Sequence, residues 1–173
     1  MASNQPTQAL NVVPSDTINI PEPDAYITGT SSAGTGTTIT DASANFLGVS
    51  NPGNTGYSNR VSIGDVLYSN NSGALTAVTV TAVTNNTNLV VSASLTGGLP
   101  YEIYRANAGA SDREGFSLFV GGSGGGAANV SVVPASSDQT VVLQNVPESS
   151  FIPLQVKRVN SSDTTATNII ALR

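Results

Sequence analysis

The chain has 173 residues and a formal net charge of −5, and it contains no His, no Cys and no Trp. A thiolate nucleophile, a zinc site with Cys or His ligands and a Ser-His-Asp triad are excluded, because the residues that build them are absent. The chain has six Lys and Arg residues in all, whereas neutralising phosphates needs them in clusters, so we expect no nucleic acid partner.

The composition favours β-strands over helices. Charged residues make up 10% of the chain, well below the roughly 25% of ordinary soluble domains, so the long Lys and Glu side chains that suit helices are scarce. Valine occurs 19 times, and 22 serines, 19 threonines and 17 asparagines keep the surface polar. Because β-branched residues favour strands, we predict an all-β protein.

The sequence shows no sign of secretion or membrane insertion. Residues 1–25 contain neither a basic segment nor an apolar run of signal-peptide length, and no window approaches the ~18 apolar residues of a membrane span. Without cysteine, no disulfide framework suggests an oxidising compartment. We expect a soluble protein made in a cytoplasm, with no membrane partner.

Residues 1–25 are predicted to form an extended, Pro-rich arm. The segment has four prolines, each of which fixes φ and removes a backbone donor, so the arm has no core of its own. Such an arm is ordered when it lies against something else, which is either another chain or its own domain. Its large apolar side chains are candidate interface residues: Leu10, Val12, Val13, Ile18 and Ile20.

Residues 26–106 are predicted to form a small β-barrel or sandwich, because short strand-like runs alternate with turn clusters. A break in alternation near Ala82 predicts either a bulge or the end of the strand there, ahead of a turn at 85–87. Residues 41–46 could form one helical turn capped by Asp41. The strand candidates are residues 26–28, 38–40, 61–68, 75–83, 89–91 and 101–104.

Residues 107–115 are predicted to be a linker, and residues 116–173 a second small antiparallel β domain. Its last strand, 167–172, is apolar on both faces and is expected to be buried on both. Since 58 residues bury only a small fraction of their surface, we expect partner subunits to complete this core, so that the domain oligomerises. The candidate interface residues of this strand are Ile169, Ile170 and Leu172. The strand candidates are residues 116–120, 129–133, 140–144, 151–159 and 167–172.

The eleven carboxylates of the chain are scattered and predict no catalytic pair. A glycosidase needs two of them about 5–9.5 Å apart in a cleft, and a calcium site needs oxygen ligands at regular spacing, which no Asp-x-Asp-x-Asp pattern supplies. Asp112 and Glu114 lie together in the linker, where solvated charges are expected. We therefore expect no enzyme activity, no metal and no cofactor. Four further carboxylates lie among turn residues, where caps and Asx-turns account for them: Asp41, Asp65, Asp138 and Asp163.

Two loops remain as candidate binding sites. The Gly-rich run 121–126 follows a predicted strand, but it lacks the Lys-Ser/Thr pair of a phosphate-binding loop and is interpreted as a hairpin loop. Tyr57, in the Gly- and Asn-rich segment 51–59, is the best candidate for an aromatic platform that binds a sugar.

Four blocks follow one another in the C-terminal region. They are GFSLFVGG at 115–122, VVLQNVP at 141–147, IPLQVKRV at 152–159 and TTATNIIAL at 164–172. In this order they resemble small virion proteins of tailed phages and gene transfer agents, notably the head spike base family. The resemblance implies a subunit on the capsid exterior or at a vertex, as a decoration (cement) or spike-anchoring protein without catalytic residues.

The middle of the chain carries TITD at 38–41, VSIGDVLY at 61–68 and AVTVTAV at 77–83. These runs are similar to small β modules of many phage structural proteins, in which the Gly64-Asp65 turn begins a strand pair. We therefore expect a non-enzymatic structural protein of a phage virion, made in the host bacterial cytoplasm. Its expected partners are copies of itself and the major capsid protein or other virion proteins. The alternative is a tail- or fibre-borne adhesin or carbohydrate-binding module.

Overall fold

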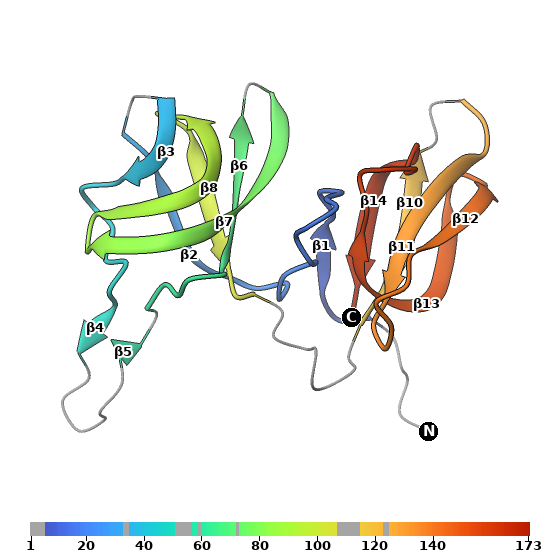
Figure 1. Cartoon of the computed structure of the whole chain (residues 1–173), viewed down its shortest axis with the longest axis horizontal. Helices are drawn as coiled ribbons and strands as arrows, with labels where there is room; N and C mark the ends of the chain where they lie inside the picture. The colour runs from blue at the N-terminus through green and yellow to red at the C-terminus, as the bar shows by residue number, and fades with distance from the viewer. Residues whose placement is uncertain are drawn as a thin grey trace. The chain divides into compact units, whose positions relative to one another are not determined.

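The computed structural model describes residues 6–32, 35–50, 57, 58, 60–71, 73–106, 115–122 and 125–173. In these ranges every regular element is a β-strand, which confirms the all-β prediction. No helix in the described ranges is long and apolar enough to cross a membrane. The strands belong to two compact units, a central unit of Asp24–Ala106 and a terminal unit that combines Met1–Pro23 with Asn107–Arg173 (Figure 1).

The central unit is one curled antiparallel sheet, in agreement with the predicted small barrel or sandwich. Its strands are β2 (Ala25–Thr30), β3 (Thr35–Thr40), β6 (Val66–Asn71), β7 (Ala74–Asn85), β8 (Asn88–Thr96) and β9 (Pro100–Tyr104). They lie in the order β2-β9-β6-β7-β8-β3, and β4 (Val49–Ser50) pairs separately with β5 (Tyr57–Ser58). The sheet curls at β7, because this strand pairs with β6 through its first half and with β8 through its second (Figure 1).

Side chains along β7 alternate between the core of the central unit and its surface. Val78 and Val80 are 1% exposed and pack inward, while the threonines between and after them face outward or are half-buried. The register shifts between Val80 and Ala82 and the strand continues to Asn85, so of the two predicted alternatives the structure has the bulge. A turn follows at Asn86 and Thr87, as expected. The buried cluster consists of Ile39, Phe46, Val61, Leu67, Val78, Val80, Leu89, Val91, Leu95, Tyr101 and Ile103.

Two local predictions in the central unit are wrong. The strand expected at 61–68 begins only at Val66, because residues 62–65 form a turn in which Asp65 N donates to Ser62 O at 3.1 Å. Gly64 has φ +97° in this turn, a conformation that side-chain-bearing residues rarely adopt. Residues 41–46 form no helical turn; the chain there has two separate turns, at 42–43 and 46–47.

The terminal unit is a six-stranded antiparallel sheet. Its strands are β1 (Ala9–Asn11), β10 (Phe116–Gly122), β11 (Ala128–Pro134), β12 (Val141–Val146), β13 (Ser150–Val159) and β14 (Thr167–Leu172). They lie in the order β1-β14-β10-β13-β11-β12. Because β13 separates β10 from β11, the Gly-rich run between these strands is not the predicted hairpin loop.

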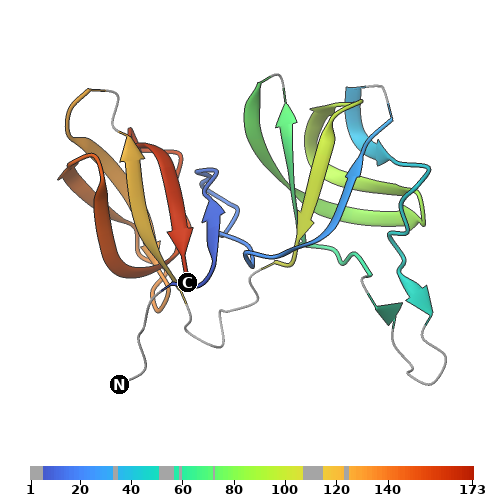
Figure 2. The same ribbon diagram turned by 180° about the vertical axis from the view of Figure 1, so that it is seen from behind.

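The N-terminal segment, predicted as an extended arm, is part of the terminal unit. β1 pairs with β14 in the register Ala9↔Leu172, and the two strands lie side by side in both views (Figure 1, Figure 2). Beyond β1 the segment follows β13, where Ile20 N donates to Lys157 O at 2.9 Å. Of the two alternatives left open by the sequence, the structure has the segment on its own domain.

Gly115, predicted as the last residue of the linker, is packed within the terminal unit. Gly115 is buried, and a Cβ atom there would lie 2.7 Å from the Ala135 Cβ and 2.8 Å from the Val156 nitrogen. Only glycine fits such a close approach, so residue 115 belongs to the packed domain. The rest of the predicted linker, with Asp112 and Glu114, lies outside the described residues.

Candidate functional site

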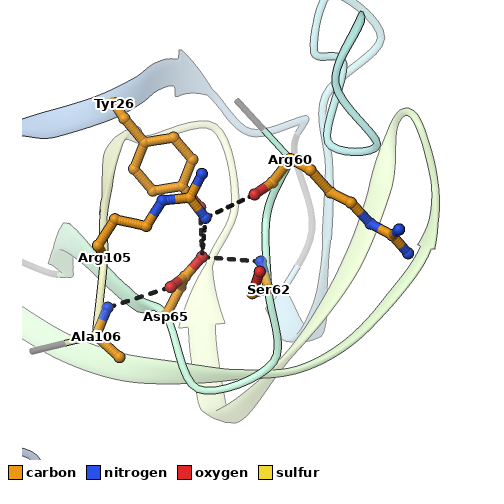
Figure 3. A network of polar contacts seen from close by, with 6 residues as sticks. All are labelled: Tyr26, Arg60, Ser62, Asp65, Arg105 and Ala106. Atoms are coloured by element: carbon orange, nitrogen blue, oxygen red, sulfur yellow. Dashed lines mark hydrogen bonds and ion pairs between the residues drawn. The ribbon is translucent and has the colours of Figure 1, made fainter. Parts of the chain in front are cut away.

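A buried carboxylate organises one end of the central unit (Figure 3). The Asp65 side chain is 4% exposed, and its Oδ2 accepts hydrogen bonds from the Tyr26 hydroxyl at 2.5 Å and from Ser62 N at 2.8 Å. Oδ2 also forms an ion pair with Arg105 at 3.2 Å, while Oδ1 accepts a hydrogen bond from Ala106 N at 3.1 Å. We call these residues the Asp65 clamp.

Arg105 and Tyr26 complete the Asp65 clamp. The Arg105 guanidinium stacks 3.8 Å from the Tyr26 ring centroid and donates to Arg60 O at 2.7 Å. Desolvation by burial, and then the hydrogen bond to Asp65, raise the pKa of the Tyr26 hydroxyl. Since the phenol keeps its proton and the carboxylate is occupied by four donors, the clamp is unsuited to proton transfer. The Asp65 clamp links β2, through Tyr26, to Ala106, the last residue of the central unit.

A second buried carboxylate lies in the same unit. Asp41 is 7% exposed; its Oδ1 accepts from Ser43 N at 2.8 Å, and its Oδ2 accepts from the Tyr101 hydroxyl at 2.8 Å. Burial, followed by the bond to Asp41, raises the pKa of Tyr101. The predicted Asx-turn at Asp41 is thus confirmed, whereas the tyrosine partners of Asp41 and Asp65 were not foreseen from the sequence.

The remaining turn carboxylates lie on the surface. Asp138 forms an ion pair with Lys157 at 2.6 Å, and that hydrogen bond lowers the pKa of Asp138. Asp163 is exposed in a turn with φ 63°. Within the described ranges, no three His, Cys, Asp or Glu side chains are grouped to hold a metal ion.

The predicted interface residues divide into two groups. Leu10, Ile20 and Ile169 are 6%, 4% and 3% exposed inside their own unit, which corrects their assignment as interface residues. The N-terminal segment pairs with β14 and β13 of the same unit, where the prediction had partner subunits. The half-buried members keep part of their surface free: Val12, Val13, Ile18, Ile170 and Leu172.

An apolar row crosses the face of the terminal sheet that is opposite Ile169. Ile170 on β14 pairs with Phe119 on β10, which pairs in turn with Phe151 on β13. Directly paired residues lie on the same face of a sheet, so these three side chains are neighbours. Phe151 is 53% exposed, and the other two are half-buried. We call Ile170, Phe119 and Phe151 the Phe119 row.

The strand partners described here next to Ile170 and Phe119 are uncharged. Asn11 pairs with Ile170 at one end, and in the next pair of residues Leu172 lies opposite Ser117. The Ser117 hydroxyl accepts a hydrogen bond from Gln155 Nε2 at 3.0 Å. The face therefore offers apolar and neutral polar groups, which suits a protein partner better than an ion.

One residue of β13 departs from simple alternation. Strict alternation would place Ile152, Leu154 and Val156 on the core side, but Leu154 is 37% exposed while Ile152 and Val156 are 8% and 0% exposed. The register between β10 and β13 shifts at this point, so Leu154 lies in an irregular segment away from the core. Phe119 could have been found, because it alternates with the core residues on either side of it.

The proposed sugar platform at Tyr57 falls in β5, and its side chain lies outside the described residues. Comparison of the chain with protein-family models, with curated proteins and with solved structures finds no match. The function is therefore inferred from the residues of the chain itself.

Proposed function

We propose that the chain is a non-enzymatic structural subunit of a phage or gene-transfer-agent particle, carried on the capsid as a decoration or spike-anchoring protein. The proposal rests on the resemblance of residues 115–172 to small virion proteins and on one structural observation. That observation is the Phe119 row on the face of a folded sheet. Its partners are further copies of the chain and the capsid protein.

The Phe119 row has the composition of a contact surface. Soluble monomers rarely expose contiguous apolar patches without a use for them, and the centres of protein interfaces are enriched in aromatic residues and poor in charge. Phe151 is the most exposed member at 53%, and Phe119 lies directly beside it. A neighbouring subunit that covered both rings would remove this surface from water.

The hydrogen bonds and strand pairs within each unit suit a structural subunit that must resist mechanical force. The Asp65 clamp joins Tyr26, near the start of the central unit, to Ala106 at its end. β1 joins the first segment of the terminal unit to its last strand. These bonds hold together the start and end of the central unit and the two segments of the terminal unit, as a subunit under mechanical load requires.

One observation favours the second candidate, a carbohydrate-binding module on a tail or fibre. An exposed phenylalanine such as Phe151 presents an aromatic face, on which a sugar ring can stack. Binding of the purified chain to a glycan array, abolished by Phe151→Ser, would support this alternative over a decoration protein.

The decoration role is tested on particles of the phage or transfer agent whose genome encodes the chain. We expect mass spectrometry of purified particles to detect the chain, and image reconstruction to place it on the outer capsid surface. Absence of the chain from purified particles would overturn the proposal.

The contact surface is tested with variants in the same particles. Phe119→Ser with Phe151→Ser should lower the copy number per particle, because it removes the aromatic contact. Leu75→Ser is the matched control, since Leu75 is 42% exposed but belongs to the central unit. Equal copy numbers for the double variant and the control would argue against the Phe119 row as the contact.

A further inference from the structure

The terminal sheet ends in a strand with an open edge. β12 is the last strand in the order β1-β14-β10-β13-β11-β12, and the described residues place no strand against its second edge (Figure 1). An edge strand presents backbone N–H and C=O groups that can pair with another strand.

The edge of β12 lacks the charged residues and prolines that commonly protect an edge strand. Segment 139–145, QTVVLQN, contains no charged residue and no proline. Val141 and Val142 are 40% and 37% exposed although they point to opposite faces, and Leu143 is half-buried. Edge strands that stay unpaired are commonly blunted by Lys, Pro or an inward charge, so an uncharged, β-branched edge favours pairing.

The polarity of this segment is symmetric about Val142. Three apolar residues, 141–143, are flanked by two polar residues on each side. In an antiparallel pair of two such strands centred on Val142, the apolar centre meets itself and the flank 139–140 meets the flank 144–145. A two-fold interface requires this self-complementarity, which a strand chosen for a different partner does not need.

The charges that border the segment are compatible with the same register. Asp138 and Glu148 are the nearest acidic residues. In the pair centred on Val142, Asp138 lies opposite Val146, so no two carboxylates face each other. Asp138 is in addition neutralised by Lys157 at 2.6 Å. For a chain with a net charge of −5, a contact without like charges is a condition for self-association.

The C-terminal end of β12 limits the registers in which a partner strand can pair with it. Asn145 has φ 56°, and the register between β11 and β12 shifts between the Ala128↔Val146 and Val130↔Leu143 pairs. The regular edge therefore stops before Asn145. This leaves 140–144 as the pairing segment, with Val142 at its centre.

We propose that β12 pairs antiparallel with β12 of a second copy, centred on Val142, so that two terminal sheets join into one continuous sheet across a two-fold axis. The partner is recognised by main-chain hydrogen bonds and by the matching of 141–143 with itself. This inference does not depend on a role in a virion, and its surface is distinct from the Phe119 row.

The test is sedimentation of the purified chain over a range of concentrations. Because a single strand pair is a small interface, we expect a reversible dimer that dissociates on dilution. Val142→Lys should raise the dissociation constant at least about tenfold, since it sets two like charges opposite each other at the centre of the pair. Val142→Thr, which stays β-branched and uncharged, should keep the dimer.

Two controls separate this edge from other contacts. Leu75→Lys adds the same charge at an exposed position of the central unit and should dimerise like the wild type. Phe119→Ser with Phe151→Ser should also dimerise, so that failure of the contact proposed above does not affect this result. Hydrogen exchange should show amides of 140–144 protected at high concentration and released on dilution. A wild type that is monomeric throughout, a Val142→Lys variant that associates like the wild type, or unchanged exchange at 140–144 would each overturn the proposal.

Discussion

Asp16 and Ser162 lie 146 residues apart in the sequence and share two hydrogen bonds, each of 2.9 Å. Ser162 donates through both its backbone N–H and its hydroxyl, and the Ser161 hydroxyl adds a third bond to the same carboxylate at 2.7 Å. The N-terminal segment is thus fastened to the turn that follows β13. The terminal unit is assembled from the two ends of the chain, with the central unit between them in sequence.

The first prediction is that the terminal unit folds without the central unit, provided that both of its segments are present. Thr7 N donates to Arg173 O at 2.7 Å, so the two segments can be joined by a short Gly-Ser linker after residue 173. The permuted chain 115–173–linker–6–23 should unfold cooperatively. Residues 115–173 alone should not, because they lack β1. Circular dichroism during thermal unfolding distinguishes the two outcomes.

Leu10→Ala tests with a single substitution how much the N-terminal segment stabilises the terminal unit. The side chain is 6% exposed, and its loss should cost the terminal unit about 3 kcal/mol through lost burial and the cavity left behind. Val12→Ala, at a half-buried position of the same segment, is the matched control and should cost less. Equal and negligible effects of both variants would mean that the segment contributes little to the fold.

The second prediction concerns the Asp65 clamp. Asp65→Asn removes the charge that faces Arg105 and places an amide N–H₂ against existing donors. We expect the central unit to lose about 3 kcal/mol of stability, whereas Asp24→Asn, at an exposed position of the same unit, should have little effect. All five tyrosines of the chain lie between residues 26 and 104, so tyrosine fluorescence during urea unfolding reports on the central unit alone.

Local pattern was enough to predict most of the strands but not the partner of the N-terminal segment. The alternation at Val78 and Val80 and the break near Ala82 are properties of neighbouring residues, and the structure confirms them. The pairing Ala9↔Leu172 joins opposite ends of the chain, and nothing near Ala9 specifies Leu172. The sequence therefore left two alternatives for the segment, and only the fold distinguishes them.

The buried carboxylates of the candidate site also have long-range partners that the local sequence does not specify. Asp65 was predicted as a turn residue because of its neighbours, and it does bond to Ser62 in that turn. Its burial depends on Tyr26 and Arg105, which are 39 and 40 residues away. A turn residue and a buried clamp have the same local sequence, so their difference appears only once the strands are in place.

The third prediction is a dependence of the terminal unit on acid. Hydrogen bonds from Ser162 N and then from the Ser161 and Ser162 hydroxyls hold the pKa of Asp16 below its ordinary value of 3.8. A carboxyl with a lowered pKa in the folded state stabilises that state above its unfolded pKa, and the contribution is lost as pH falls through the folded pKa. Asp16→Asn should therefore flatten the loss of stability between about pH 5 and pH 2. Hydrogen exchange of the Ser162 amide, measured across this range, should show the same change; an identical pH profile for variant and wild type would contradict the prediction.

The last prediction concerns alkaline pH and the central unit. Burial raises the pKa of Tyr101 above its ordinary value of 10.0, and the bond to Asp41 adds to the shift. Burial and the bond to Asp65 act in the same direction on Tyr26. A group whose pKa is raised in the folded state contributes stability that is complete below its unfolded pKa and is lost as pH rises above it. Above about pH 10 each such tyrosine should therefore lower the free energy of unfolding by about 1.4 kcal/mol per pH unit.

Tyr101→Phe isolates one of these contributions. The variant should be less stable than the wild type at pH 8, because Asp41 loses a buried hydrogen-bond donor. Between about pH 10 and pH 11.5 its stability should fall less steeply, since phenylalanine has no proton to release on unfolding. The measurement is urea unfolding at a series of pH values, followed by the fluorescence of the remaining tyrosines. Curves that stay parallel above pH 10 would show that Tyr101 ionises equally in the folded and unfolded chain, and the buried bond to Asp41 would then have no part in alkaline stability.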